Sequence, residues 1–130
     1  MCLKENGKTM EIAYWIVAGL LALAVLAAGG MKLARPKEAL AASGMGWVSD
    51  FGGGTVKLIG AAEVLGAIGL ILPKLTGIAP ILSPIAALAL AVTMLGAIVV
   101  HVRRKESFTP SLVLGLLAVA AAILGFLTLS

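Results

Sequence analysis

The sequence predicts an all-α fold: a four-transmembrane-helix antiparallel bundle with a short interfacial helix between spans one and two. Of the 130 residues, 61% are hydrophobic and only 12% are charged, whereas soluble domains average about 45–50% apolar and ~25% charged residues. The apolar residues form four runs, and each is close to the ~17–25 residues that cross a hydrocarbon core of ~30 Å. These spans cover approximately residues 12–31, 56–72, 78–100 and 111–129. We therefore expect one transmembrane domain over residues 1–130.

The first span is followed by the longest polar connection. Tyr14 and Trp15 open the span, and both residue types favour the membrane–water boundary. In the connection over residues 33–55, Pro36 at a first turn and Gly44 as a stop signal predict a short helix. We expect this segment to lie along the membrane surface.

Shorter connections join the remaining spans. Pro73 ends the second span, and the turn over residues 73–77 makes spans two and three antiparallel neighbours. We expect Pro80 in the first turn of the third span and a kink at Pro84, because an internal proline removes a helical hydrogen bond. Pro110 opens the fourth span, which contains no ionisable residue and is predicted to serve packing.

The distribution of lysine and arginine predicts the orientation in the membrane, because these residues concentrate in cytoplasmic loops. One end of the predicted bundle carries six of them: Lys32, Arg35, Lys37, Arg103, Arg104 and Lys105. The other end carries three: Lys4, Lys8 and Lys74. We therefore expect loops 32–55 and 101–110 in the cytoplasm and both termini outside. Topology and contact with anionic lipid explain the net charge of +4, so no nucleic-acid partner is expected.

Glu63 is the residue that most requires explanation. It lies about eight residues into the second span, so at ~1.5 Å per residue it is roughly 12 Å below the helix start. A carboxyl group at that depth is costly, and it usually faces the bundle interior or a cavity and has a partner. Lys32 and His101 end the first and third spans on the membrane side where the second span begins. The sequence therefore predicts that these three side chains gather near one end of the bundle.

Three more residues are expected at this end. Lys57 lies near the start of the second span, and Trp47 and Asp50 belong to the connection before it. Together, the six side chains predict a pocket that is apolar inside and polar at its mouth, as small-molecule sites are.

Each candidate also has a structural explanation. An ion pair between Glu63 and Lys32 would fix the register of two helices. The ammonium group of Lys57 would extend to the interface, His101 would cap a helix C-terminus, and Trp47 would anchor the interface. The sequence leaves both sets of roles open.

Metal, nucleophile and phosphate chemistry have little support. One histidine, His101, and one cysteine, Cys2, make a poor ligand set, so no metal is expected. A lone thiol also excludes a two-cysteine redox relay. The glycine run at 52–54 lacks the Lys-Ser/Thr that follows in a phosphate-binding loop.

Three segments carry a family resemblance: GGMKL at 29–33, LIGAAEVLGAIGL at 58–70 and MLGAIVVHVRR at 94–104. They resemble the DoxX-like family of small four-helix integral membrane proteins, and the similarity covers essentially everything from Met10 onward. The resemblance makes Lys32, Glu63 and His101 the polar positions of the family.

The resemblance implies a multi-pass protein of the bacterial cell membrane. The family name attaches to a subunit of a thiosulfate:quinone oxidoreductase, and other relatives look like partners of redox proteins. The implied function is a membrane subunit, not itself an enzyme, that is associated with redox or quinone chemistry and offers a small apolar-ligand pocket. Its partners would be the lipid bilayer and a redox protein. Small residues at four-residue spacing are compatible with a homodimer as well.

Two alternatives stay open. The first is a stand-alone membrane enzyme on a hydrophobic substrate, with Glu63 as acid or base. The second is a small proton-coupled multidrug-type transporter. Such transporters carry their essential glutamate in the first helix, and the first span of this chain has none.

Overall fold

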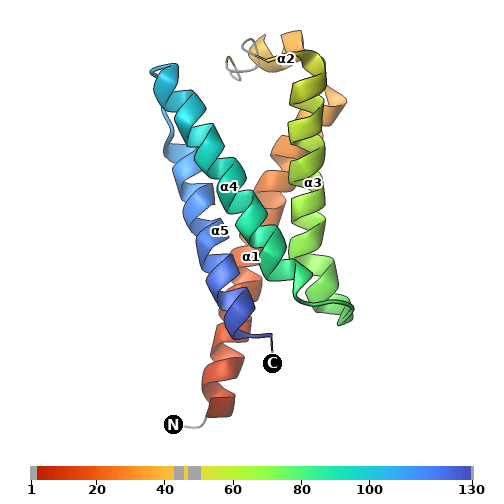
Figure 1. Ribbon diagram of the computed structural model, residues 1–130, viewed down its shortest axis with the longest axis vertical. Coiled ribbons are helices and arrows are strands. Elements are labelled where there is room, and N and C mark those ends of the chain that lie inside the picture. The colour runs from red at the N-terminus through yellow and green to blue at the C-terminus, as the bar shows by residue number, and fades with distance from the viewer. Residues whose placement is uncertain (1–2, 43–45, 47–50, 130) are drawn as a thin grey trace.

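The computed structural model describes residues 3–42, 46 and 51–129 and is helical almost throughout (Figure 1). Its helices are α1 (Leu3–Ala34), α2 (Lys37–Ala42), α3 (Gly53–Thr76), α4 (Leu82–Arg103) and α5 (Thr109–Leu127). Within these ranges there is no β-strand, and four helices are long and apolar enough to cross a membrane. The predicted all-α four-helix bundle with a short helix after the first span is confirmed.

The four long helices alternate in direction around the bundle. α1 packs against α3 and α5, and α4 packs against the same two helices. The start of α1 and the end of α5 therefore lie at one end, and α2 lies at the other (Figure 1). The α1–α3 pair and the α4–α5 pair diverge toward the end that carries α2.

Apolar side chains cover the outside of the bundle as well as its core. Leu21 and Leu70 are fully buried, whereas Leu23, Leu65 and Val92 are each more than two-thirds exposed. A helix at the surface of a soluble protein would carry polar residues on its outer face. Contact with the lipid bilayer explains this apolar exterior.

α1 and α3 approach each other closely at two glycines. A methyl group at Gly29 would lie 2.8 Å from the carbonyl oxygen of Gly60 and 3.0 Å from Cβ of Glu63. One at Gly60 would lie 2.8 Å from Cβ of Lys32. Such contacts are too short for any other residue, and close backbone packing is a main source of helix association in lipid.

At the end of the bundle with the termini, side chains satisfy backbone groups next to Pro73. The Tyr14 hydroxyl donates to the carbonyl oxygen of Leu70 at 2.6 Å, and the Lys74 backbone N–H donates to the Ser83 hydroxyl at 3.1 Å. In an uninterrupted helix, these two backbone groups would bond to each other. A proline can disturb such a turn, and α1 and α4 each supply a side-chain partner beside Pro73.

The Lys74 ammonium joins three helices at the same end. Nζ lies 3.0 Å from Oε1 of Glu11, 2.9 Å from Oγ1 of Thr128 and 4.9 Å from the centre of the Tyr14 ring. The Lys74 side chain is almost completely buried. The sequence predicts only a topological role for Lys74, whereas in the structure it connects α3 with α1 and with the residue that follows α5.

At the opposite end of the bundle, α2 is held by apolar packing against α3. Leu40 is fully buried against Val56 of α3, and Met31 and Phe51 pack around these two residues. This contact fixes the position of Phe51 just before α3.

Some helix ends differ from those expected. α1 begins at Leu3, earlier than the apolar run, and α3 continues past Pro73 to Thr76. α4 begins at Leu82, so Pro80 precedes the helix and Pro84 lies in its first turn. An N–H group in a first turn has no helical partner to lose. The reason for expecting a kink at Pro84 therefore does not apply.

Replacing Gly29 by alanine is expected to lower the free energy of unfolding by about 1–3 kcal/mol, because the methyl group overpacks the α1–α3 contact. The matched control is the adjacent Gly30, where an added Cβ meets nothing within 4 Å and alanine favours the helix by about 0.5–1 kcal/mol. Unfolding of the detergent-solubilised variants measures both effects. Equal stability of the two variants would contradict the close contact.

Candidate functional site

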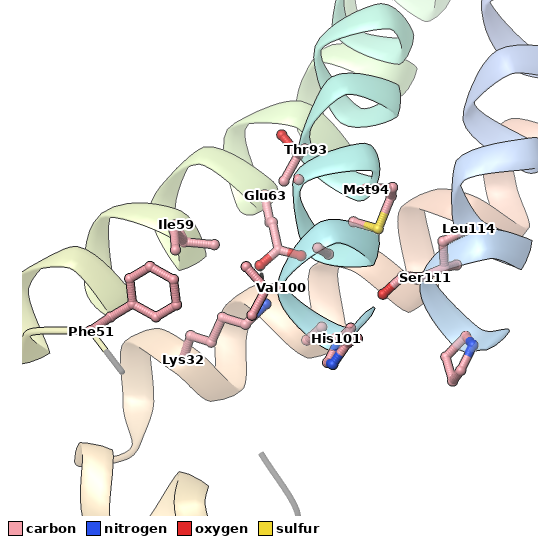
Figure 2. A pocket seen from close by; sticks show the side chains of 14 residues that line it. Lys32, Phe51, Ile59, Glu63, Thr93, Met94, Val100, His101, Ser111 and Leu114 are labelled. Atoms are coloured by element: carbon pink, nitrogen blue, oxygen red, sulfur yellow. Dashed lines mark hydrogen bonds and ion pairs between the residues drawn. The ribbon is translucent and has the colours of Figure 1, made fainter. Parts of the chain in front are cut away.

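A cavity of about 450 Å³ lies at the end of the bundle where the two helix pairs diverge (Figure 2). All four long helices and Phe51 line it. The lining residues are Ala28, Lys32, Phe51, Ile59, Glu63, Thr93, Met94, Gly96, Ala97, Val100, His101, Pro110, Ser111 and Leu114. The cavity is mainly apolar with a few convergent polar groups, and its volume is within the ~300–1,000 Å³ of small-molecule sites.

Lys32 and Glu63 form an ion pair across α1 and α3 at the cavity wall. Figure 2 shows the two side chains pointing toward each other. Lys32 is 7% exposed and Glu63 is 3% exposed, and Glu63 lies about 15 Å along the axis from the first residue of α3. Buried charges need a partner at close range, because water no longer solvates them. The depth of Glu63 in the second span predicts such a partner.

His101 lines the cavity and contacts the loop after α4. Its Nδ1 lies 2.6 Å from Oε1 of Glu106, and Nε of Arg104 lies 3.4 Å from Oε2 of the same carboxylate. A carboxylate only accepts hydrogen bonds, so Nδ1 is the donor and Nε2 is the nitrogen not bound to Glu106. The hydrogen bond from His101 lowers the pKa of Glu106 below its usual value, with a smaller contribution from Arg104.

The backbone at the end of α4 explains how Glu106 reaches His101. Lys105 adopts a positive φ of 56°. The Lys105 N–H donates to the Val102 carbonyl at 3.1 Å, and the Glu106 N–H donates to the His101 carbonyl at 3.0 Å. These are the two bonds of a Schellman motif, formed here with lysine at the position that usually holds glycine.

Of the other three sequence candidates, the structure describes only Lys57. Lys57 is not among the cavity-lining residues. Its ammonium donates to the carbonyl oxygens of Leu33 at 2.7 Å and Arg35 at 2.9 Å. The last carbonyls of a helix lack helical partners and favour a positive charge, so Lys57 caps α1. Trp47 and Asp50 lie outside the described residues.

A model described as the DoxX-like family matches residues 16–124 of the chain. The chain belongs to the DoxX-like family. The matched range contains the whole cavity lining and both partners of the buried ion pair. No curated protein and no solved structure matches the chain.

The cavity of this DoxX-like protein includes residues that sequence reasoning did not assign to a site. The sequence pattern does not select Phe51, and it predicts that the fourth span serves packing. Ser111 is buried in the first turn of α5 and faces the cavity. The sequence signal that could have identified Ser111 is its position at the start of an otherwise apolar helix. Glu106 was missed because only the turn at Lys105 brings it to His101.

The polar groups around the cavity do not form a metal-ligand set. Among the residues that the structure describes, no group of three or more His, Cys, Asp or Glu side chains is arranged to hold a metal ion. Glu63 faces an ammonium group and His101 faces a carboxylate. The arrangement is suited to hydrogen bonding and proton exchange with a bound molecule.

Removing one partner of the buried ion pair is expected to cost more stability than removing both. Lys32→Met or Glu63→Leu alone leaves an uncompensated buried charge and should lower the free energy of unfolding by about 3–5 kcal/mol. The double variant should recover most of that loss, since two apolar side chains replace the pair. A double-mutant cycle in detergent micelles measures the coupling. Additive losses would show that the two charges do not depend on each other.

Replacing His101 by phenylalanine is expected to raise the pKa of Glu106 toward its usual value, because the largest cause of the lowered pKa is removed. Since the pKa is lowered in the fold, the contact stabilises the protein above the usual glutamate pKa and is lost as pH falls through the lowered value. A carboxyl-carbon NMR titration in micelles reports the pKa. Arg104→Met is the control and should produce a smaller rise. An unchanged Glu106 pKa in the His101 variant would refute the contact.

Proposed function

We propose that this DoxX-like chain is a membrane subunit that offers a pocket to a quinone-sized apolar ligand and works with a redox-protein partner. One observation carries the proposal: an apolar cavity of about 450 Å³ at one end of a transmembrane bundle, with Lys32, Glu63 and His101 as its charged or titratable lining residues. Apolar walls with few polar groups are the usual composition of a small-molecule site.

A quinone has the chemistry that this lining would recognise. Its ring is flat and apolar, and its two carbonyl oxygens only accept hydrogen bonds. The Lys32 ammonium and the Ser111 hydroxyl are donors in the cavity wall, and Met94 and Phe51 offer apolar surface for a ring. The His101–Glu106 pair connects the cavity with the loop after α4, where a proton could be exchanged with water.

The two alternatives make different demands on the same residues. A stand-alone enzyme that uses Glu63 as acid or base must first release it from Lys32. A transporter for lipophilic cations needs a site with a net negative charge, whereas this pair is neutral overall. Product formed without a partner would favour the enzyme, and efflux of a fluorescent cation from cells would favour the transporter.

The proposal also specifies how the bundle is oriented in the membrane and on which of its ends the redox partner docks. The loops at the cavity end carry exposed positive residues, including Arg35, Arg103 and Lys105. By the preference of positive residues for the cytoplasm, we place the cavity end at the cytoplasmic face of a bacterial cell membrane. The redox partner would dock on this end, next to the cavity.

Native mass spectrometry of the protein in mild detergent, after incubation with a decyl-benzoquinone, tests the pocket. The wild type should retain the quinone. Glu63→Gln should retain less, because the position of Lys32 at the cavity wall depends on the carboxylate. Ala97→Phe fills part of the cavity from α4 while both charged residues are kept, and it should lose binding. Leu23→Phe, on the lipid-facing surface, is the control.

The same spectra test the partner and the oligomeric state. A co-purifying redox protein, or a dimer of the chain, would appear as an added mass. Equal quinone retention in wild type, Ala97→Phe and Leu23→Phe would mean that the quinone sits elsewhere, and the proposed pocket would be wrong.

A further inference from the structure

The cavity extends to the outer surface of the bundle between α3 and α4. Its lining on α4 runs from Met94, which is buried, to Gly96, which is exposed. Across the opening, Ile59 of α3 and Phe51 line the other side and are only partly buried. In Figure 2, Ile59 and Phe51 lie toward α3 and face Val100 of α4. The cavity therefore has a side opening within the membrane-spanning part of the bundle.

The contacts between α3 and α4 explain why this opening exists. A Cβ added at Gly69 would lie 2.9 Å from Cβ of Ala86, and one at Gly66 would lie 2.7 Å from Cδ2 of Leu90. These two helices are thus in close contact toward the end with the termini. Gly96 lies about 9 Å further along α4 than Leu90, and a Cβ added there meets nothing within 4 Å. At this level Ala97 of α4 and Glu63 of α3 line the cavity, so the two helices have separated there.

The surroundings of the opening are apolar. Val92, Leu95 and Val99 flank Gly96 on the exposed side of α4 and face outward. No charged residue lies between positions 76 and 100, so this surface of α4 contacts lipid chains. A molecule that reaches the opening from outside comes from the bilayer and not from water.

We propose that the ligand enters and leaves the cavity sideways from the bilayer, between α3 and α4, and that its tail lies across Gly96 in contact with lipid. The inference rests on the proposed function and specifies its substrate class: a lipid-soluble molecule with a compact hydrogen-bonding head and an apolar tail. The head reaches the buried wall with Lys32 and Glu63, and the tail needs no protein partner. Gly96 leaves space for the tail because any larger side chain would extend into the opening.

The test compares two glycines at which an added side chain meets no neighbour. Gly96→Trp fills the opening, and Gly19→Trp, on α1, is the matched control, since an added Cβ meets nothing within 4 Å at either position. Each variant is reconstituted in phosphatidylcholine vesicles that contain a photoreactive decyl-benzoquinone, and the rate of covalent labelling is measured. Gly96→Trp should slow labelling on the order of tenfold, and Gly19→Trp should label at the wild-type rate. Gly96→Leu repeats the test if the tryptophan variant does not fold.

The outcomes separate the entry route from the pocket itself. If the wild type is labelled and only the Gly96 variants are labelled more slowly, the lateral route is supported. If the wild type is labelled and both Gly96 variants are labelled at the same rate, the lateral route is wrong and the pocket remains. Entry from the loop end past His101 would then be indicated. A wild type that is not labelled, although the vesicles hold the probe, overturns the proposed function and the route together.

Discussion

The contact between Gly29 of α1 and Gly60 of α3 is the constraint on which the rest of the structure depends. The two backbones meet there without side chains between them. Lys32 then lies against Gly60 and Glu63 lies against Gly29, so each charged side chain starts beside the other helix and can reach its partner. The ion pair is buried where the two helices approach each other this closely, at the wall of the cavity. The two charges in turn hold the pair of helices together in a medium where apolar side chains drive no association.

The cavity follows from an asymmetry between the two ends of the bundle. At the end with the termini, Lys74 connects three helices, and the Ser83 hydroxyl ties α4 to the turn beside Pro73. At the other end, α1 and α3 stay paired through Lys32 and Glu63, and the α4–α5 pair diverges from them (Figure 1). The space between the helix pairs therefore widens toward α2 (Figure 1).

The sequence predicts the parts of this arrangement that depend on the membrane and misses those that depend on single turns. Length and hydropathy identify the four helices, and the depth of Glu63 requires a partner, for which Lys32 is within reach. The meeting of His101 with Glu106 depends on one residue, Lys105, with an unusual positive φ, and composition does not signal it. The capping role of Lys57 depends on where α1 ends, and helix ends are the least predictable feature of a sequence.

Structural and functional roles for Lys32 and Glu63 are compatible in this geometry. Their pairing cancels the net charge of the cavity wall, so a lipophilic cation gains little there, whereas a neutral ligand keeps the ammonium hydrogens as donors. A neutral acceptor with an apolar body therefore suits the cavity better than a charged one. Because each charge is buried against the other, the protein cannot lose one of the two alone without losing stability. The residues that would shape the proposed ligand site are thus the ones that pair the two helices.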